Sequence, residues 1–280
     1  MFGAGRLWHQ IVQPGGLTTS FQPIFEVHWS GRRSVFALEA LTRGPRGTNV
    51  ERSDVLFEYV RRKRREADVD RLAIGAALRE ARGLPGLPGL SLNVHASTLE
   101  QDRLLPVWLA EQAREYGISC HRFLVEIVEH APPWSGTPFL MSLDRLRNLG
   151  IRIALDDVGL GQSNFRMILD CQPDLLKIDR HFVAGAHADE HRRAVLESIS
   201  DLACRLGGRA VAEGIEDERD LEVALSAGID LVQGYLLCAP YSSQGLRKLD
   251  FMNNPTGPAF ELDDRPYEDP SPTKEILLPG

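Results

Sequence analysis

The chain has 280 residues, of which 43% are hydrophobic and 25% are charged, and its formal net charge at pH 7 is −7. This composition is typical of an ordinary globular protein and argues against a fibrous or largely disordered chain. The negative charge argues against duplex nucleic acid as the main partner, because binding to a phosphate backbone requires a basic face. A small anionic ligand is compatible with this charge, since bound metal ions can reverse the sign of an acidic site.

The cysteines are widely spaced and include no C-x-x-C pair. They stand at Cys120, Cys171, Cys204 and Cys238. This spacing argues against a zinc knuckle or a disulfide framework and favours small buried thiols in a reducing compartment. The N-terminus has no basic head followed by an apolar stretch, and no run approaches about 18 apolar residues. We therefore expect a cytoplasmic protein with neither an export signal nor a membrane span.

Eight short apolar runs bounded by turn residues predict eight strands. They cover residues 18–29, 34–44, 90–96, 122–129, 151–159, 175–180, 209–216 and 231–239. Helical patterns lie between them at 53–81, 102–116, 138–149, 188–206 and 217–227. Strands that alternate with helices in this number predict an α/β protein with a closed (β/α)8 barrel.

The connection between the first two runs departs from a standard barrel. Only residues 30–33 separate these runs, whereas a crossover between parallel strands needs about a dozen residues or more. The two strands should therefore form an antiparallel hairpin. We expect a modified TIM-type barrel in which strand 1 runs antiparallel to strand 2.

The chain divides into one large domain and two short ends. The barrel is expected to occupy residues 18–250, and residues 1–17 precede it as an N-terminal extension. Residues 251–280 contain six of the chain's 17 prolines, interspersed with acidic residues. This composition is typical of an extended or disordered tail.

Polar side chains recur where the predicted strands end. They are Glu39, Asn93, Glu126, Asp156, Asp157, Lys177, Glu213 and Gln233. In parallel barrels the carboxyl ends of the strands form one rim, and catalytic side chains lie there. A carboxylate inside an apolar strand is costly unless a partner or a metal compensates it, and crowded carboxylates repel one another. We therefore expect bound cations at this rim.

The residue types at the rim indicate which metals bind. Oxygen donors without cysteine or histidine favour hard ions, Mg²⁺ or Mn²⁺, over zinc. The adjacent Asp156 and Asp157 allow one aspartate to bridge two ions while the other completes the second site, as in two-metal phosphoryl transfer. Lys177 is then placed to orient or deprotonate the attacking water and to offset charge in the transition state.

Short motifs follow one another in a specific order between residue 21 and about residue 240. E-A-L stands at 39–41 and is followed by T-R at 42–43. The other motifs are Q-P-I at 22–24, Asn93, E-I-V-E at 126–129, D-D at 156–157, P-D-L-L-K-I-D at 173–179, A-E-G-I-E at 212–216 and Q-G-Y at 233–235. Together they resemble the EAL-domain family of cyclic-di-GMP phosphodiesterases.

The resemblance implies a function for each rim residue. The first of two metal ions would be ligated by Glu39, Asn93, Glu126 and Asp156, and the second by Asp156, Asp157 and Glu213. Lys177 and Gln233 would address the reactive water. The predicted catalytic set is therefore Lys177, Glu39, Asp156, Gln233 and Glu216.

The resemblance also implies a set of substrate contacts. Arg43 would bind a phosphate, because a guanidinium fork matches its geometry. Gln22 would contact a guanine, with a hydrogen bond to backbone as the alternative, and Leu41 would line the pocket. Asp179 is assigned to substrate binding and Glu216 to catalysis, with support of neighbouring groups as the alternative for both.

Members of the family cleave cyclic-di-GMP to linear pGpG, and many act as dimers, so we expect a homodimer with this substrate. The chain departs from the family in one loop. The family usually reads D-D-F-G-T-G-Y-S-S, whereas residues 156–164 read D-D-V-G-L-G-Q-S-N, with Val158, Leu160 and Gln162 at the altered positions. In the family this loop couples dimer contacts to the metal site, and Glu129 anchors it.

Two alternative functions compete with hydrolysis. The first is a degenerate EAL module that binds cyclic-di-GMP or a partner protein without turnover, and the altered loop is its support. Retention of every metal ligand and of the lysine favours the enzyme. The second is an enolase-type barrel enzyme, which also uses carboxylates and a lysine at strand ends. That reading gives no function to Asn93 or to the paired aspartates.

Overall fold

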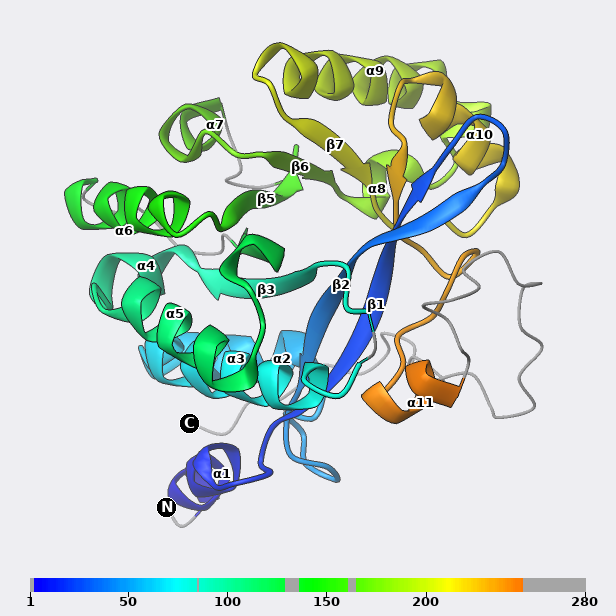
Figure 1. Cartoon of the computed structure of the whole chain (residues 1–280). Coiled ribbons are helices and arrows are strands. Elements are labelled where there is room, and N and C mark those ends of the chain that lie inside the picture. The colour runs from blue at the N-terminus through cyan, green and yellow to red at the C-terminus, as the bar shows by residue number, and fades with distance from the viewer. Residues whose placement is uncertain (1–2, 85, 129–135, 161–164, 249–280) are drawn as a thin grey trace.

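The computed structural model describes residues 3–84, 86–128, 136–160 and 165–248 (Figure 1). The predicted tail at 251–280, Glu129 and Gln162 lie outside the described residues. Among the described residues, no helix has both the length and the apolar character needed to cross a membrane.

Eight strands close into a barrel in which each strand pairs with the next along the chain and β8 pairs with β1. They are β1 (Thr18–Val27), β2 (Arg33–Arg43), β3 (Leu90–His95), β4 (Phe123–Val128), β5 (Arg152–Val158), β6 (Leu175–Ile178), β7 (Arg209–Ala212) and β8 (Leu231–Val232). β1 is antiparallel to both β2 and β8, and the other neighbours are parallel. The predicted modified TIM-type barrel is confirmed.

Helices surround the strands of the barrel (Figure 1). They are α1 (Gly3–Val12), α2 (Ser53–Arg62), α3 (Glu66–Ala81), α4 (Ala96–Gln101), α5 (Leu105–Tyr116), α6 (Thr137–Asn148), α7 (Phe165–Cys171), α8 (Arg180–Val183), α9 (Glu190–Arg205), α10 (Glu218–Ser226) and α11 (Ser243–Lys248), with the 3₁₀ helices η1 (Cys120–Arg122) and η2 (Ala186–Ala188). α1 lies within the predicted extension 1–17, and its Ile11 is buried in one cluster with Leu56 and Val60 of α2.

Two of the expected elements differ in extent. The single helix expected at 53–81 is broken between α2 and α3, where Arg64 takes a left-handed conformation with φ of 54°. The strand expected at 231–239 ends at Val232. Its apolar continuation turns back instead, because the Leu236 amide donates to the Ile215 carbonyl and the Cys238 amide to the Gly234 carbonyl.

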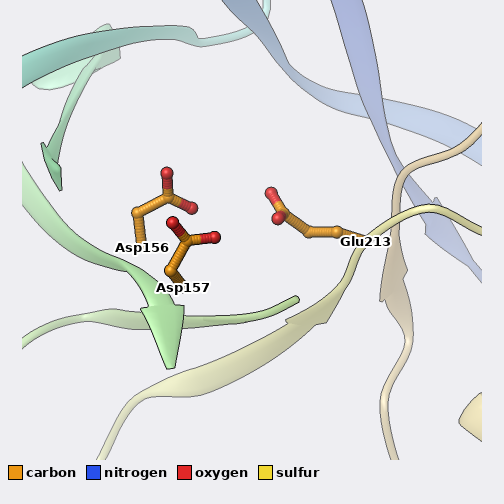
Figure 2. A group of neighbouring side chains, drawn as sticks. All are labelled: Asp156, Asp157 and Glu213. Atoms are coloured by element: carbon orange, nitrogen blue, oxygen red, sulfur yellow. The ribbon is translucent and has the colours of Figure 1, made fainter. Parts of the chain in front are cut away.

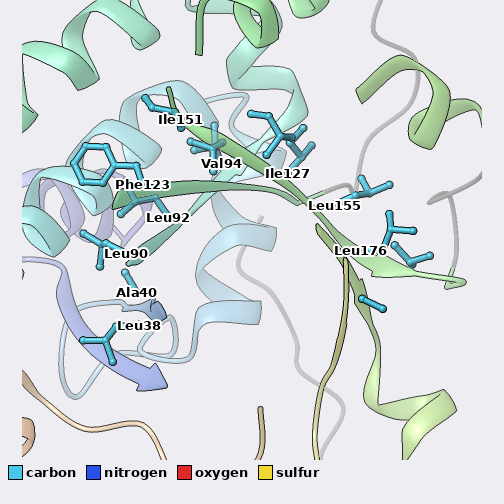
Figure 3. Packing of buried hydrophobic residues seen from close by; sticks show 14 of the residues in the cluster. Leu38, Ala40, Leu90, Leu92, Val94, Phe123, Ile127, Ile151, Leu155 and Leu176 are labelled. Atoms are coloured by element: carbon cyan, nitrogen blue, oxygen red, sulfur yellow. The ribbon is translucent and has the colours of Figure 1, made fainter. Parts of the chain in front are cut away.

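The two faces of each strand pack into different hydrophobic clusters. Alternate residues such as Leu90, Leu92 and Val94 face the helices and form the main core, together with Phe123 and Ile127 of β4 (Figure 3). Residues of the other parity fill the barrel interior. This second group, the apolar layer, consists of Ile24, Ala37, Leu124, Ala154, Leu175, Val211 and Leu231. The period of two along a strand therefore separates the two cores.

Candidate functional site

The polar residues predicted at the strand ends stand one step above the apolar layer. Six of them, together with Gln22 of β1, lie two residues along the chain from a member of that layer and therefore face the same interior. These pairs are Ile24 and Gln22, Ala37 and Glu39, Leu124 and Glu126, Ala154 and Asp156, Leu175 and Lys177, Val211 and Glu213, and Leu231 and Gln233. Asn93 is in register with Glu126 on the neighbouring strand. We refer to these polar residues as the polar layer.

The ammonium group of Lys177 lies in the middle of four carboxylates. Its Nζ is 2.6 Å from Glu126 Oε2, 2.6 Å from Glu213 Oε1, 3.3 Å from Asp156 Oδ1 and 3.4 Å from Glu39 Oε2. The Lys177 side chain is 2% exposed and that of Glu126 is fully buried. One cation thus bridges acids from β2, β4, β5 and the end of β7, and the polar layer forms a single charged cluster.

Neutral side chains hold the buried carboxylate of Glu39 in place. The amide of Asn93 donates to Glu39 Oε1 at 3.1 Å, and that of Gln233 donates to Glu39 Oε2 at 2.8 Å. Asn93 is on β3 and Gln233 directly follows β8, so the orientation of Glu39 depends on closure of the barrel. Hydrogen bonds of this kind stabilise the ionised form of a buried acid.

A bulge in β5 brings two consecutive aspartates to the same site. The pairing of β5 with β6 shifts between Leu155 and Val158, so two residues, Asp156 and Asp157, stand opposite Lys177. Asp157 takes a left-handed conformation with φ of 51°. In a regular strand these neighbours would point to opposite faces, whereas here their carboxylates gather with that of Glu213 (Figure 2). One oxygen from each of these three residues lies within 4.8 Å of the other two.

Crowding raises the pKa of several acids in the protein without metal. Burial, followed by repulsion from Glu39, raises the pKa of Glu126 to about 8. Burial, followed by repulsion from Asp156, raises the pKa of Asp157 to about 6. Burial also raises the pKa of Glu213 well above its usual value. These carboxyls retain protons that ordinary surface acids would lose, and a metal ion that binds to them has to displace those protons.

At Glu39 and Lys177, nearby opposite charges outweigh the effect of burial on the pKa. Burial of Glu39 opposes its ionisation, but the charge of Lys177 and the hydrogen bonds from Asn93 and Gln233 outweigh burial and lower the pKa of Glu39. Burial likewise disfavours the charged form of Lys177, yet the surrounding carboxylates raise its pKa well above the usual value. Lys177 is therefore a permanent cation in the protein without metal.

The expected substrate contacts on β1 and β2 share a face with Glu39. Gln22 is directly opposite Glu39 in the antiparallel register, and Leu41 and Arg43 follow Glu39 at steps of two, which places all of them on one side. Leu41 and Arg43 are half-buried. The Gln22 amide donates to the Cys238 carbonyl at 3.2 Å, which is the backbone bond that the sequence left open as its alternative function.

The remaining predicted residues lie around the polar layer. Asp179 accepts a hydrogen bond from the His181 amide at 2.7 Å and thereby caps α8, and its charge contributes to the raised pKa of Asp157. Glu216 forms a 2.8 Å ion pair with Arg180, and its side chain is 43% exposed. These contacts are of the supporting kind that the sequence offered as the alternative for Asp179 and Glu216.

Ser91 was not predicted and belongs to the site. Its side chain is fully buried on β3, and its hydroxyl donates to Glu126 Oε1, so Glu126 is held by Ser91 on one oxygen and by Lys177 on the other. Ser91 precedes Asn93 by two residues in a strand. The alternation of faces could therefore have identified it, because residues two apart in a strand point the same way.

The family model of the EAL domain matches residues 6–240. The chain belongs to the EAL domain family. It is 31% identical over 150 residues to the cyclic di-GMP phosphodiesterase PdeF of Escherichia coli K12, a match that covers 54% of this chain and 20% of PdeF. It is 30% identical over 171 residues to the cyclic di-GMP phosphodiesterase RocR of Pseudomonas aeruginosa, covering 61% of this chain and 43% of RocR. The matched part of the chain thus spans less than half of either relative.

Solved EAL structures resemble this one closely. Klebsiella pneumoniae BlrP1, in a manganese and cyclic di-GMP complex at pH 6, superposes with a TM-score of 0.72 at 27% identity, covering 82% of this chain and 57% of BlrP1. A standalone EAL protein from Vibrio cholerae O395, in a form with cyclic di-GMP bound, gives a TM-score of 0.70 at 25% identity, covering 81% of this chain and 93% of that one. The barrel described above is therefore the EAL fold.

Replacing Lys177 with Met should destabilise the protein without metal, and the effect should grow with pH. Burial acts to raise the pKa values of Glu39, Glu126 and Asp157, and the ammonium acts to lower them, so its removal raises all three. A buried acid with a raised folded-state pKa opposes folding more strongly as the pH rises above its unfolded-state pKa of about 4. The loss should therefore be small at pH 5 and reach about 3 to 5 kcal/mol above pH 8. Urea unfolding in EDTA from pH 5 to pH 8.5 measures this change.

The matched control is Lys63→Met, because Lys63 is exposed and its replacement should alter the free energy of unfolding by less than about 0.5 kcal/mol at either pH. Equal losses of stability for Lys177→Met at pH 5 and at pH 8.5 would show that the carboxylates around Lys177 do not titrate as described.

Proposed function

We propose that this protein hydrolyses cyclic-di-GMP to linear pGpG with the help of two Mg²⁺ or Mn²⁺ ions. The observation that carries the proposal is the polar layer, in which four carboxylates converge on one buried lysine and a fifth lies beside them on the β5 bulge. Membership of the EAL family supports the substrate, since relatives named as cyclic di-GMP phosphodiesterases match this chain.

The donor set fits hard divalent cations. Every candidate ligand offers oxygen, and the metal-compatible cluster found among the described residues contains no histidine or cysteine. Oxygen donors alone favour hard ions such as Mg²⁺ and Mn²⁺. We assign Glu39, Asn93, Glu126 and Asp156 to one ion, and Asp156, Asp157 and Glu213 to the other. When bound, such ions would lower the pKa of water and offset charge on the phosphodiester. Asp156 is assigned to both sets because its charge acts on both Glu126 and Asp157.

Lys177 is assigned to the reactive water in this proposal. Without metal, the surrounding carboxylates raise the pKa of Lys177 and hold its proton in place. With the ions bound to those carboxylates, Lys177 would orient or deprotonate the water and offset charge in the transition state. Gln233 donates to Glu39 beside it. These two groups orient the water whose oxygen attacks phosphorus. A bond forms from the water oxygen to phosphorus, and the bond from phosphorus to one ribose oxygen breaks. The attacking water gives up a proton, the departing ribose oxygen takes up a proton from solvent, and the ring opens to pGpG.

Residues on the β1–β2 hairpin would bind the substrate. Arg43, at the end of β2, is assigned to a phosphate, since its guanidinium can donate two parallel hydrogen bonds. Leu41 would pack against the dinucleotide, and Gln22 would contact a guanine once its amide leaves the Cys238 carbonyl. Asp179 and Glu216 are assigned to the outer part of the same site, where the first supports the position of α8 and the second the position of Arg180.

The proposal extends to the organisation of the chain. We assign catalysis to residues 18–250, with 1–17 as an N-terminal extension, and we propose a homodimer. Phe165 and Leu169 support the dimer, because they stand one turn apart on α7 and are 74% and 69% exposed. The four cysteines are free thiols, which supports a reducing cytoplasmic location.

Purified protein with Mg²⁺ or Mn²⁺ should convert cyclic-di-GMP to pGpG, and Glu39→Gln should lower the rate by more than about 100-fold, because it removes a metal ligand and a charge that Lys177 requires. Chromatography of the nucleotides measures the conversion. Glu111→Gln is the control, since Glu111 lies exposed on α5 and its replacement should leave the rate unchanged. Tight binding of cyclic-di-GMP by the unaltered protein without any pGpG would instead identify a receptor.

Ser91→Ala should weaken Mn²⁺ binding by about 10- to 100-fold, the usual cost of removing a group that orients a metal ligand. The change leaves every proposed ligand in place and frees one oxygen of Glu126 from its hydrogen bond. Isothermal titration calorimetry measures the affinity. Ser198→Ala on α9 is the control, because the Ser198 hydroxyl donates within its own helix, to the Ala194 carbonyl. An unchanged Mn²⁺ affinity in Ser91→Ala would remove Glu126 from the ligand set.

A further inference from the structure

A cavity lies outside the polar layer. It has a volume of about 640 Å³, within the range of about 300 to 1,000 Å³ typical of small-molecule sites. Four segments of the chain form it: the turn from α1 into β1, the loop after β2, the second half of α3 and the start of α11, and these elements meet at one end of the β1–β2 hairpin (Figure 1). No member of the polar layer lines it, nor do Leu41 and Arg43.

Two arginines line this cavity without an internal counter-ion. Arg46 follows β2, and Arg79 lies near the end of α3. Within the part of the chain that the structure describes, neither guanidinium forms an ion pair or a hydrogen bond to another side chain. The acid in the lining, Glu80, accepts a hydrogen bond from the Ser243 hydroxyl instead. The lining therefore has a surplus of positive charge and of N–H donors.

A buried hydroxyl in the same lining lacks a partner. Thr19 Oγ1 is inaccessible to solvent, and no hydrogen-bond partner for it exists among the described residues. Buried polar atoms in folded proteins are nearly always hydrogen-bonded, and the described residues supply no acceptor for this hydroxyl. Rotation of the Thr19 side chain toward the cavity would give the hydroxyl a partner if a water or a ligand is bound there. Thr18 and Gln244 add further polar groups. Guanidinium forks together with hydroxyls suit a tetrahedral anion that has several acceptor oxygens.

We propose that this cavity binds a small molecule bearing a phosphate group, with Arg46 and Arg79 on the phosphate oxygens and Thr19 donating its hydroxyl. A bare phosphate would fill only part of the volume, so the ligand carries an organic portion that occupies the rest. The residues assigned to metal and substrate do not line this cavity, but it borders them, because Thr18 is paired with Arg43 and Thr19 with Thr42.

The test is titration of inorganic phosphate into the full-length protein in EDTA, followed by calorimetry. EDTA removes divalent ions, so phosphate cannot bind through metal at the polar layer. We expect one saturable site, with Arg46→Ala and Arg79→Ala each weakening phosphate affinity about tenfold, since a charge-assisted hydrogen bond contributes that much or more. Thr19→Val, which keeps the shape and removes the hydroxyl, should also weaken it.

Two arginine controls separate this site from others. Arg82→Ala removes an exposed guanidinium just past α3 that does not line the cavity, and Arg43→Ala removes the guanidinium proposed for the catalytic mouth. Both should leave phosphate affinity unchanged within about twofold. The proposal is overturned if phosphate does not bind saturably, or if Arg43→Ala alone abolishes binding. It is also overturned if Thr19→Val stabilises the fold and leaves phosphate affinity unaltered, because that result is expected when the hydroxyl is unsatisfied and has no ligand.

Discussion

The contact of one buried ammonium group with four carboxylates governs the structure of the barrel mouth. Lys177 reaches Glu126 and Glu213 at 2.6 Å, with Asp156 and Glu39 slightly further away. Burial strips these groups of hydration, and in a medium of low polarity like charges repel strongly. One lysine cannot neutralise so many acids, and the raised pKa of Glu126 shows that protonation supplies part of the balance. Divalent cations would neutralise the remaining negative charge of the carboxylates and would also activate water. The proposed hydrolysis depends on this excess of negative charge at the barrel mouth.

The barrel creates this cluster by repeating one geometric rule. Along each strand the residue two positions beyond the apolar layer faces the interior, so an acid at that offset in several strands becomes part of one ring. A slip of one residue in any strand would turn its polar side chain toward the helices. The bulge in β5 breaks the rule once, and this exception places Asp157 beside Asp156. Closure of the barrel then lets amides from other strands fix Glu39.

The barrel, the antiparallel hairpin and the polar rim could be read from the sequence because each depends on a period of two and on loop length. Features set by contacts between distant segments could not be read in this way. The break near Arg64 lies within a helical pattern that continues across it. The bond from Gln22 to the Cys238 carbonyl joins residues 216 positions apart. Ser91 could have been found by alternation, but a lone serine in an apolar strand is a weak signal until Glu126 is known to face it.

The central claim is that the polar layer is a site for two divalent cations, and anomalous diffraction from a crystal of this protein soaked in Mn²⁺ tests it most directly. The account predicts two Mn²⁺ peaks among the mouth carboxylates, one bordered by Glu39 and Asn93 and the other by Asp157 and Glu213. It also predicts that Lys177 no longer contacts all four carboxylates at once. An anomalous map without a peak in the mouth, with Lys177 still bridging the acids, would contradict the account.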